Sequence, residues 1–395
     1  MGNLSEAPPA PPHPLRLLHV LEAFLGGTRR FLLDVCEGLP REDFLQHALV
    51  SPLRAEDFGD MERLRASGVE VSLLPMTRAV SPISDLRCYL ALRRILFAWR
   101  PHVLHAHSSK AGFLARAAAE SLPIEQRPTV IYSPHCFAFQ ARTGALHHLL
   151  YRTLERAAAA WTDAYVFVGQ GEVLAALDAG LHPRREAHLL PLPVDATRFT
   201  ATPTRSRADL GLPDGRLLAM IGGLRPQKAP DLALHAFAEA APDVPDAHLV
   251  FVGEGPLRAQ LDALTARLGL TSRVTFLGSR DDLPDLLPYF EAVLLASLWE
   301  AMPYSILEAM AASRPIVLAD LPGPADEVAE ARAGLTFHPH RRHSLAAAIR
   351  GIMMIPPAQR ASFGASGAAF VRTRHNPTES LAALGSIYQA LAPNI

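Results

Sequence analysis

The sequence predicts an α/β protein made of two doubly wound domains. Short β-rich runs alternate along the chain with longer Ala/Leu/Arg segments of helical period, a pattern typical of a parallel sheet covered by helices. With 395 residues the chain is too long for one ordinary hydrophobic core, so two cores are expected. Hydrophobic residues make up 49% of the chain, which indicates a well-buried globular protein.

Candidate strands occur on both sides of a Thr-, Pro- and Arg-rich linker at 194–215, which lacks apolar periodicity. In the first half they are 15–22, 46–52, 69–76, 101–108, 129–135, 164–169 and 187–193. In the second half they are 216–223, 247–255, 273–279, 292–297, 314–320 and 333–339. The stretches 257–268 and 303–312 are predicted to be helical, and an amphipathic helix is predicted at 377–391.

These elements predict a division of the chain into a disordered tail at 1–14, a Rossmann-like domain at 15–195 and a second Rossmann-like domain at 196–376. A final helix at 377–395 is expected to pack back on the first domain. The tail is Pro- and Ala-rich without an apolar core, so it does not resemble a signal peptide. Two domains joined in this way would face a central cleft, where open α/β sheets bind ligands.

Charge and composition argue against several classes of protein. The formal net charge is −1, with 38 basic and 39 acidic residues, whereas a nucleic-acid binder usually has a basic excess. No apolar run reaches the roughly 20 residues of a membrane-spanning helix. Cys36, Cys88 and Cys136 are not arranged as a CxxC pair, which indicates a reduced, cytoplasmic protein with neither a zinc site nor a disulfide framework.

Lysine is used only at Lys110 and Lys228, although the chain has 38 basic residues. A coding bias toward arginine explains the bulk, but both lysines fall in Gly- or Pro-marked turns after predicted strands. A lysine ammonium is compact and can lie against a phosphate, where a planar guanidinium fits differently. The sequence leaves open whether either lysine is functional.

Two glutamates are the strongest candidates for chemistry. Glu300 lies in the loop after a predicted strand, and Glu308 follows about two turns along a helix whose first turn contains Pro303. Backbone N–H groups of that turn, around Tyr304 and Ser305, are suited to a phosphate. Taken alone, two such glutamates are more often ordinary solvated side chains.

The stretch that holds them, SLWEAMPYSILEAMAASRP, resembles the E-x7-E signature of retaining family-4 glycosyltransferases, which have the GT-B fold. The resemblance extends in order over nearly the whole chain. In the first half it covers LLHVLEAFLGGTRRFLLDV, RPHVLHAHSSKAGFLARAAA and VIYSPHCFAF, especially as in enzymes that build bacterial surface polysaccharides. In the second half it covers GGLRPQKAPDLALHAF, LVFVGEGPLRAQL and VTFLGSRDDLPDLL.

The resemblance implies roles for the charged residues. Glu308 would hold the ribose hydroxyls of a nucleotide-sugar donor, because a carboxylate accepts from two neighbouring OH groups. Glu300 would contact hydroxyls of the transferred sugar, and Lys228 would bind the diphosphate. His135 would lie at the reaction centre, near the sugar and the attacking hydroxyl.

Backbone groups would complete the implied donor site. Gly26 and Gly27 would let the main chain approach the phosphates, since no side chain stands in the way. Gly278 and Ser279 would line the base pocket. The helix tip that meets the phosphates would comprise Met302, Pro303, Tyr304 and Ser305.

The chain departs from the family pattern at several positions. Gly223 stands where the family has a phosphate-binding arginine, and the sequence leaves open whether Arg225 replaces it. Ala301 stands where a glycine is usual, and Gly169 where a serine is usual. Leu192-Pro193 replaces a common Asn-Gly.

The resemblance implies sugar transfer with retention of the anomeric configuration. The chain has no D-x-D pattern to hold a divalent metal, so we expect no metal and no cofactor, the nucleotide-sugar being a substrate. Lys228, Arg225 and the helix tip would neutralise the departing nucleoside diphosphate. A UDP-sugar is the expected donor, on the family's base rate, and a glycan or lipid-linked intermediate is the expected acceptor.

Segment 85–100, DLRCYLALRRILFAWR, places basic residues among Tyr89, Phe97 and Trp99. One interpretation is a core-facing helix with a solvated basic face. The other is a contact with the anionic membrane surface where a lipid-linked acceptor resides. The expected location is therefore cytoplasmic, with peripheral contact at the inner membrane face as an open alternative.

Other features have simple explanations. His105 and His107 alternate on a predicted strand and could hold a metal, but a paired strand face or a contact near the cleft is the commoner reason. His135 and Cys136, if adjacent on a strand, would point to opposite faces and not pair. Neither Gly-rich strand end completes G-x-G-x-x-G, which disfavours dinucleotide oxidoreduction.

Two alternative functions stay open at the level of sequence. A sugar-nucleotide epimerase shares the expected architecture, and would change a donor without any acceptor. A non-catalytic nucleotide-sugar-binding subunit is the second, for which the missing arginine at Gly223 is the best argument.

Overall fold

The computed structural model describes residues 14–55, 59–141, 144–200, 203–339 and 341–393. The chain folds into two compact units. As far as their residues are described, the first comprises Met1–Val168, Ala175–Leu190 and Thr378–Ile395, and the second comprises Gly169–Leu174 and Pro191–Pro377. The tail predicted at 1–14 lies outside the described residues, except for Pro14.

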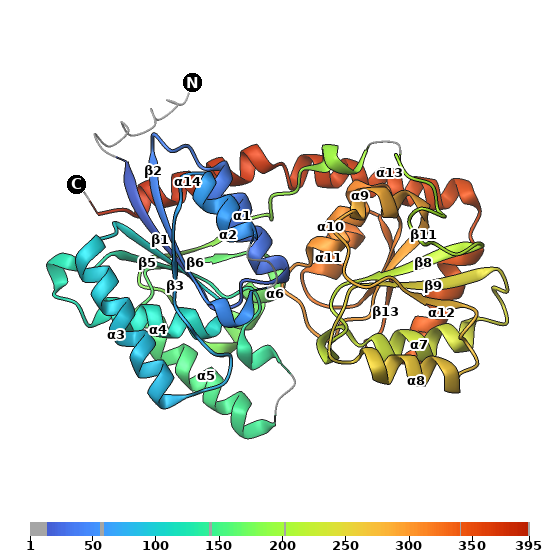
Figure 1. Cartoon of the computed structure of the whole chain (residues 1–395), viewed down its shortest axis with the longest axis horizontal. Helices are drawn as coiled ribbons and strands as arrows, with labels where there is room; N and C mark the ends of the chain where they lie inside the picture. The colour runs from blue at the N-terminus through green and yellow to red at the C-terminus, as the bar shows by residue number, and fades with distance from the viewer. Residues whose placement is uncertain (1–13, 56–58, 142–143, 201–202, 340, 394–395) are drawn as a thin grey trace. The chain divides into compact units, whose positions relative to one another are not determined.

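The first unit is built on a parallel sheet of order β3-β2-β1-β4-β5-β6-β7 (Figure 1). Its strands are β1 (Leu15–Leu21), β2 (Phe44–Val50), β3 (Glu70–Leu73), β4 (Val103–His107), β5 (Thr129–Ser133), β6 (Ala164–Phe167) and β7 (Glu186–Leu189). Helices α3 (Pro82–Trp99), α4 (Ser109–Glu120) and α5 (Ala145–Ala159) lie over one face of this sheet (Figure 1). The other face is covered by α1 (Gly26–Gly38), α2 (Gly59–Ala66) and α14 (Pro377–Leu391).

The second unit has a parallel sheet of order β10-β9-β8-β11-β12-β13. Its strands are β8 (Arg216–Ile221), β9 (Ala247–Val252), β10 (Val274–Phe276), β11 (Phe290–Leu295), β12 (Ile316–Ala319) and β13 (Gly334–Phe337). The helices are α7 (Pro230–Ala240), α8 (Arg258–Arg267), α9 (Leu283–Leu286), α10 (Tyr304–Ala311), α11 (Pro324–Glu330), α12 (Arg342–Met354) and α13 (Pro357–Arg374). Helix α6 (Gln170–Ala179) contributes its first residues to this unit and the rest to the first unit.

In each sheet the strand order reverses next to the first strand of the unit. The reversal lies between β1 and β4 in the first sheet and between β8 and β11 in the second. Connections diverge at such a point, so the carboxyl ends of the two neighbouring strands are where open α/β sheets bind ligands. The fold therefore singles out the loops that follow β1, β4, β8 and β11.

Each run predicted to be a strand overlaps an observed strand, but several predictions run too far at the carboxyl end. The strand predicted at 216–223 ends at Ile221, and the strand predicted at 247–255 ends at Val252. Gly222 and Gly253 come next, with φ of 141° and 144°. These conformations are open to glycine and turn the chain out of the ladder, so the loops begin earlier than hydrophobicity indicates.

The predicted helices are confirmed where the sequence named them, as α8, α10 and α14. Helix α14 packs inside the first unit: the Tyr388 hydroxyl lies 2.6 Å from His105 Nδ1, and Thr129 Oγ1 donates to Leu391 O at 2.8 Å. These contacts support the proposal that the segment 377–395, described as far as 393, belongs with the first domain.

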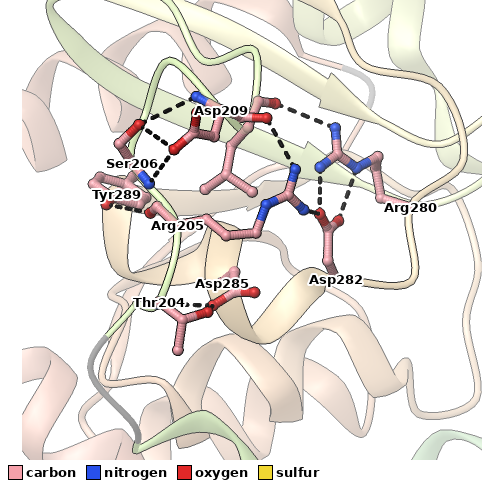
Figure 2. Close-up of polar contacts among 9 residues, drawn as sticks. Thr204, Arg205, Ser206, Asp209, Arg280, Asp282, Asp285 and Tyr289 are labelled. Carbon is pink, nitrogen blue, oxygen red and sulfur yellow. Dashed lines mark hydrogen bonds and ion pairs between the residues drawn. The ribbon is translucent and has the colours of Figure 1, made fainter.

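The predicted linker at 194–215 is more structured than its composition indicates. Asp195 Oδ1 accepts from the N–H of Thr197 at the start of a 3-10 turn. Further along, Arg205 Nη1 binds Asp282 Oδ2 at 2.6 Å, and the Thr204 hydroxyl binds Asp285 Oδ1 (Figure 2). Polar contacts thus fasten the segment after residue 203 to the second unit.

Candidate active site

The central feature of the second unit is an ion pair at its switch point, the place between β8 and β11 where the strand order reverses. Lys228 ends the 3-10 turn Pro226–Lys228 after β8, and Glu300 lies in the loop after β11. The Lys228 ammonium donates to Glu300 Oε1 at 2.6 Å. The Lys228 and Glu300 side chains are 19% and 8% exposed, so the pair is largely but not completely buried. Because β8 and β11 are neighbours, residues 72 positions apart in sequence meet here.

Gln227 joins the same two loops beside the ion pair. The side-chain Nε2 of Gln227 donates to Trp299 O at 3.0 Å and lies 3.5 Å from Glu300 Oε2. The backbone carbonyl of Gln227 accepts from the N–H of Leu298 at 2.8 Å. The loop that carries Glu300 is therefore held to the Lys228 loop by backbone as well as side-chain bonds. Sequence reasoning missed Gln227; its place directly before Lys228 was the only signal.

Arg225 folds back toward the position of the missing family arginine. A Cβ atom at Gly223 would lie only 3.3 Å from Arg225 Nε and 3.5 Å from Glu254 O. The N–H of Arg225 also donates to Gly223 O at 2.8 Å, which closes a tight turn. The Arg225 side chain thus occupies the space next to Gly223. The side chain of an arginine at position 223 would begin in the same space.

The loop after β10 contains the residues predicted to line the base pocket. Gly278 O accepts from the N–H of Gly253 at 2.7 Å, which ties the loop to the end of β9. Ser279 is exposed. Arg280 binds Asp282 through Nε and Nη2 (Figure 2), and Arg205 binds the same carboxylate. The main chain around Ser279 is therefore anchored on both sides.

The predicted helix tip begins one residue later than expected. Pro303 is the N-cap of α10, so it precedes the first turn and does not lie in it; a proline side chain offers no capping hydrogen bond. Met302, Pro303 and Tyr304 are buried, and Ser305 is half-buried. Glu308 is half-buried on the second turn of the same helix.

In the first unit, Gly26 and Gly27 open α1 directly after the β1 loop. Gly26 has a φ of 55°, and a Cβ there would meet nothing within 4 Å. Backbone conformation, not crowding, therefore explains the glycine. The helix N-terminus that follows has no side-chain cap at Leu25, and carries the partial positive charge of the helix dipole.

His135 lies just beyond β5 in an uncommon backbone conformation. Its φ is 49°, and that of Cys136 is 86°. Such left-handed conformations cost non-glycine residues free energy, and persist where the surroundings impose them. The His135 ring packs against the Phe31 ring in a T-shaped arrangement, with centroids 4.9 Å apart. Burial lowers the pKa of His135 to about 3, so its imidazole is neutral at physiological pH.

The sequence-based argument about Cys136 used the wrong local structure. The predicted strand 129–135 ends at Ser133, so His135 and Cys136 do not alternate on a strand. Both lie in the left-handed turn that follows it.

Lys110, the other lysine, donates to Asp85 Oδ2 at 2.6 Å and ties α4 to α3.

His105 and His107 belong to a buried histidine cluster that also contains His19. His19 and His105 are directly paired in the β1–β4 register, and the rings of His105 and His107 are 4.1 Å apart. Ring nitrogens of the three residues lie within 4.8 Å of one another. Sequence reasoning missed His19, although a histidine within a strongly apolar strand was a signal.

Comparison with known proteins decides the family. A model of the "Glycosyl transferase 4-like domain" matches residues 26–193, and a model of "Glycosyl transferases group 1" matches residues 204–369. A UDP-Gal:alpha-D-GlcNAc-diphosphoundecaprenol alpha-1,3-galactosyltransferase of Escherichia coli is 30% identical over 325 residues, which are 78% of this chain and 80% of that protein. The chain therefore belongs to the glycosyltransferase family of this Escherichia coli relative, to whose domains both models refer.

Solved structures agree with the assignment at the level of fold. The glycosyltransferase superposes on Anabaena Alr3699/HepE in complex with UDP-glucose with a TM-score of 0.78 and 19% identity, covering 95% of this chain and 100% of that one. WaaG, a glycosyltransferase involved in lipopolysaccharide biosynthesis, gives a TM-score of 0.75 at 18% identity, with 95% and 99% covered. The predicted GT-B fold is confirmed.

The structure also explains one departure from the family pattern. Gly169 precedes α6, and a Cβ there would lie 2.6 Å from the carbonyl oxygen of Ala301, in the loop that carries Glu300. A serine in that position would push this carbonyl away. Glycine at 169 is therefore matched to the position of the loop in this enzyme.

We predict that Gly169→Ala destabilises the glycosyltransferase by about 1–3 kcal/mol, the usual cost of overpacking, and weakens donor binding because the Ala301 carbonyl must move. Thermal unfolding and the donor KM measure the two effects. Gly144→Ala is the matched control, since a Cβ at Gly144 would meet nothing within 4 Å. Equal behaviour of the two variants would refute the contact.

Proposed function

We propose that this glycosyltransferase moves a sugar from a UDP-sugar to a glycan or lipid-linked acceptor of a growing surface polysaccharide, with retention of the anomeric configuration. The observation that carries the proposal is the Lys228–Glu300 ion pair at the switch point of the second sheet. The name of the Escherichia coli relative supports the donor and acceptor classes, and the Anabaena complexes contain UDP and UDP-glucose.

Lys228 is proposed to serve both the sugar and the diphosphate. An ammonium has three N–H donors, of which one is directed at Glu300 Oε1. The remaining donors are left for phosphate oxygens, and Glu300, held by Lys228 and Gln227, is left to accept from sugar hydroxyls. As the leaving group gains negative charge, a cation already fixed in place stabilises it without reorganisation.

The other proposed roles follow the resemblance, residue by residue. Arg225 is proposed to replace the missing arginine at 223, which its position beside Gly223 supports. That position weakens the case for a non-catalytic subunit. Glu308 is proposed to bind the ribose, and His135 the sugar near the attacking hydroxyl. Backbone contacts to the donor are assigned to Gly26, Gly27, Gly278, Ser279, Met302, Pro303, Tyr304 and Ser305.

Lys228→Ala is expected to lower kcat/KM by about one to two decades, because a hydrogen bond to a charged partner contributes roughly 1.5–3 kcal/mol. Glu300→Gln should lower it as well, since the amide keeps the shape but loses the charge that orients Lys228. Transfer from a labelled UDP-sugar to a lipid-linked acceptor is the assay. Arg350→Ala removes a surface cation of the same unit and should leave the rate unchanged. Near wild-type turnover in both site variants would rule out the proposed site.

The cationic groups are proposed to replace a divalent metal at the leaving group. We therefore expect a chelator such as EDTA to leave the transfer rate within about two-fold of its untreated value. The rate is to be measured in metal-free buffer and again after adding Mg²⁺ or Mn²⁺. Strict dependence on either ion would contradict this part of the proposal.

A peripheral contact with the inner membrane face is proposed for α3. Its buried side holds Cys88, Leu92 and Leu96. On the other side, Ile83, Leu86, Leu90 and Phe97 are 44% to 71% exposed and share a narrow helical stripe. Exposed arginines at 87, 93 and 94 flank this stripe. Apolar side chains beside cations suit an anionic lipid surface. Among the helices of the described ranges, none has the length and apolar character needed to cross a bilayer.

Cosedimentation with vesicles tests this contact. The wild-type enzyme should bind vesicles that contain anionic phospholipid, and bind neutral vesicles weakly. Replacing Ile83, Leu90 and Phe97 together by serine should abolish the binding and leave transfer to a water-soluble acceptor unchanged. Equal vesicle binding by the triple variant would disprove the role of α3.

A further inference from the structure

Three histidines of the first unit form a continuous row that leads from the interior of the sheet to His135. His19 lies on β1, His107 ends β4 and His135 follows β5. His19 Nδ1 is 3.4 Å from His107 Nε2, and His107 Nδ1 is 3.1 Å from His135 Nε2. In both pairs the ring planes are within 23° of parallel.

All three rings are neutral, because burial is the main influence on each pKa. It lowers the pKa of His19 to about 4 and that of His135 to about 3, and it moves the pKa of His107 well below its usual value. A neutral imidazole has one N–H donor and one acceptor nitrogen. A row of neutral rings joined nitrogen to nitrogen therefore has a direction: each ring donates one way and accepts the other way.

Gln46 sets the direction at the inner end of the row. Its amide Nε2 donates to Cys36 O at 3.0 Å, which leaves the amide oxygen as the atom for other contacts. Neither His19 Nε2 nor Gln46 Oε1, both buried, has a hydrogen-bond partner among the described residues. The influence of the Gln46 side chain raises the pKa of His19, against the larger lowering by burial. An acceptor has this effect, because it stabilises a protonated ring. These two buried atoms without partners match as donor and acceptor only when His19 Nε2 carries the hydrogen. His19 Nδ1 is then the acceptor that faces His107.

The same direction then passes along the row. His107 donates from Nε2 to His19 Nδ1, so His107 Nδ1 is an acceptor. His135 donates to that nitrogen from Nε2. The one ring nitrogen of His135 left with a lone pair is Nδ1.

His105 does not take part, although its ring packs against His107. The Ser133 hydroxyl donates to Val166 O at 2.6 Å, so its oxygen accepts from His105 Nε2 at 2.9 Å. His105 Nδ1 then accepts from the Tyr388 hydroxyl at 2.6 Å. Both nitrogens are bound outside the row. A metal ion shared by His19, His105 and His107 would have to displace the Tyr388 or the Ser133 hydroxyl from His105 and break the row.

We propose that His107, His19 and Gln46 are positioning residues that hold His135 as the Nε2–H tautomer, with Nδ1 available to accept a hydrogen bond from a sugar or acceptor hydroxyl. The left-handed backbone at 135–136 and the Phe31 contact fix the ring in the orientation that the row requires. The catalytic consequence rests on the proposed function; the tautomer does not, because it can be measured without activity.

The test is the ring ¹⁵N spectrum of the full chain with labelled histidine, in which two-bond couplings separate the tautomers and a His135→Gln variant assigns the signal. Wild-type His135 should be Nε2–H. In His107→Phe, which fills the space but removes both bonds, the signal should change to a mixture of tautomers. The kcat for transfer should fall by about one decade or more, with little change in donor KM.

Two further variants keep the test independent of folding and of space filling. His107→Gln offers an amide oxygen to His135 and should restore part of the single tautomer and of the rate. Gln46→Leu acts from the far end of the row and should give a smaller change in the same direction as His107→Phe. Near-UV circular dichroism verifies the fold of each variant.

Three results would overturn the proposal: an Nδ1–H tautomer in the wild type, an unchanged tautomer in both His107→Phe and Gln46→Leu, or stoichiometric Zn²⁺ bound by His19 and His107. If the tautomers mix while the transfer rate stays at the wild-type value, the positioning row stands. The catalytic role of His135 is then wrong. The two claims therefore fail separately.

Discussion

The arrangement of the candidate site depends on one constraint, the reversal of strand order in each parallel sheet. Between β8 and β11 this reversal brings together two loops that are far apart in sequence, and the Lys228–Glu300 ion pair joins them. Between β1 and β4 it places His19 directly beside His105. In each unit the reversal thus brings polar side chains from separate segments together.

The histidine row of the first unit and the Lys228–Glu300 pair of the second use burial in opposite electrostatic ways. The second keeps a charged pair partly exposed, where a lysine can be shared between a carboxylate and an incoming phosphate. The first buries imidazoles so deeply that their lowered pKa values keep them neutral, and neutral rings transmit hydrogen-bond direction in place of charge. The candidate site of the second unit thus offers charge, whereas the histidine row of the first offers neutral donors and acceptors.

Much of the fold could be predicted because it depends on local patterns. Alternating β-rich and helical runs located the strands, and the E-x7-E resemblance led to Glu300, Glu308 and Lys228. Strand ends were less predictable, since Gly222 leaves the ladder through its backbone conformation while the hydrophobic pattern continues. The row through His19 was missed, because its members lie on β1, on β4 and in the turn after β5, and only the parallel register aligns them.

The family, the two α/β units and the residue types available for donor binding could be read from the amino-acid order, since they follow from periodicity and from motifs of short range. Tertiary structure alone decided which of those residues touch. It paired Lys228 with Glu300 and set Arg225 beside Gly223. It also put the Ala301 carbonyl so close to Gly169 that a side chain at position 169 would collide with it. The physical reason is that such contacts depend on distances of a few ångströms between loops, and these are set by strand order and register.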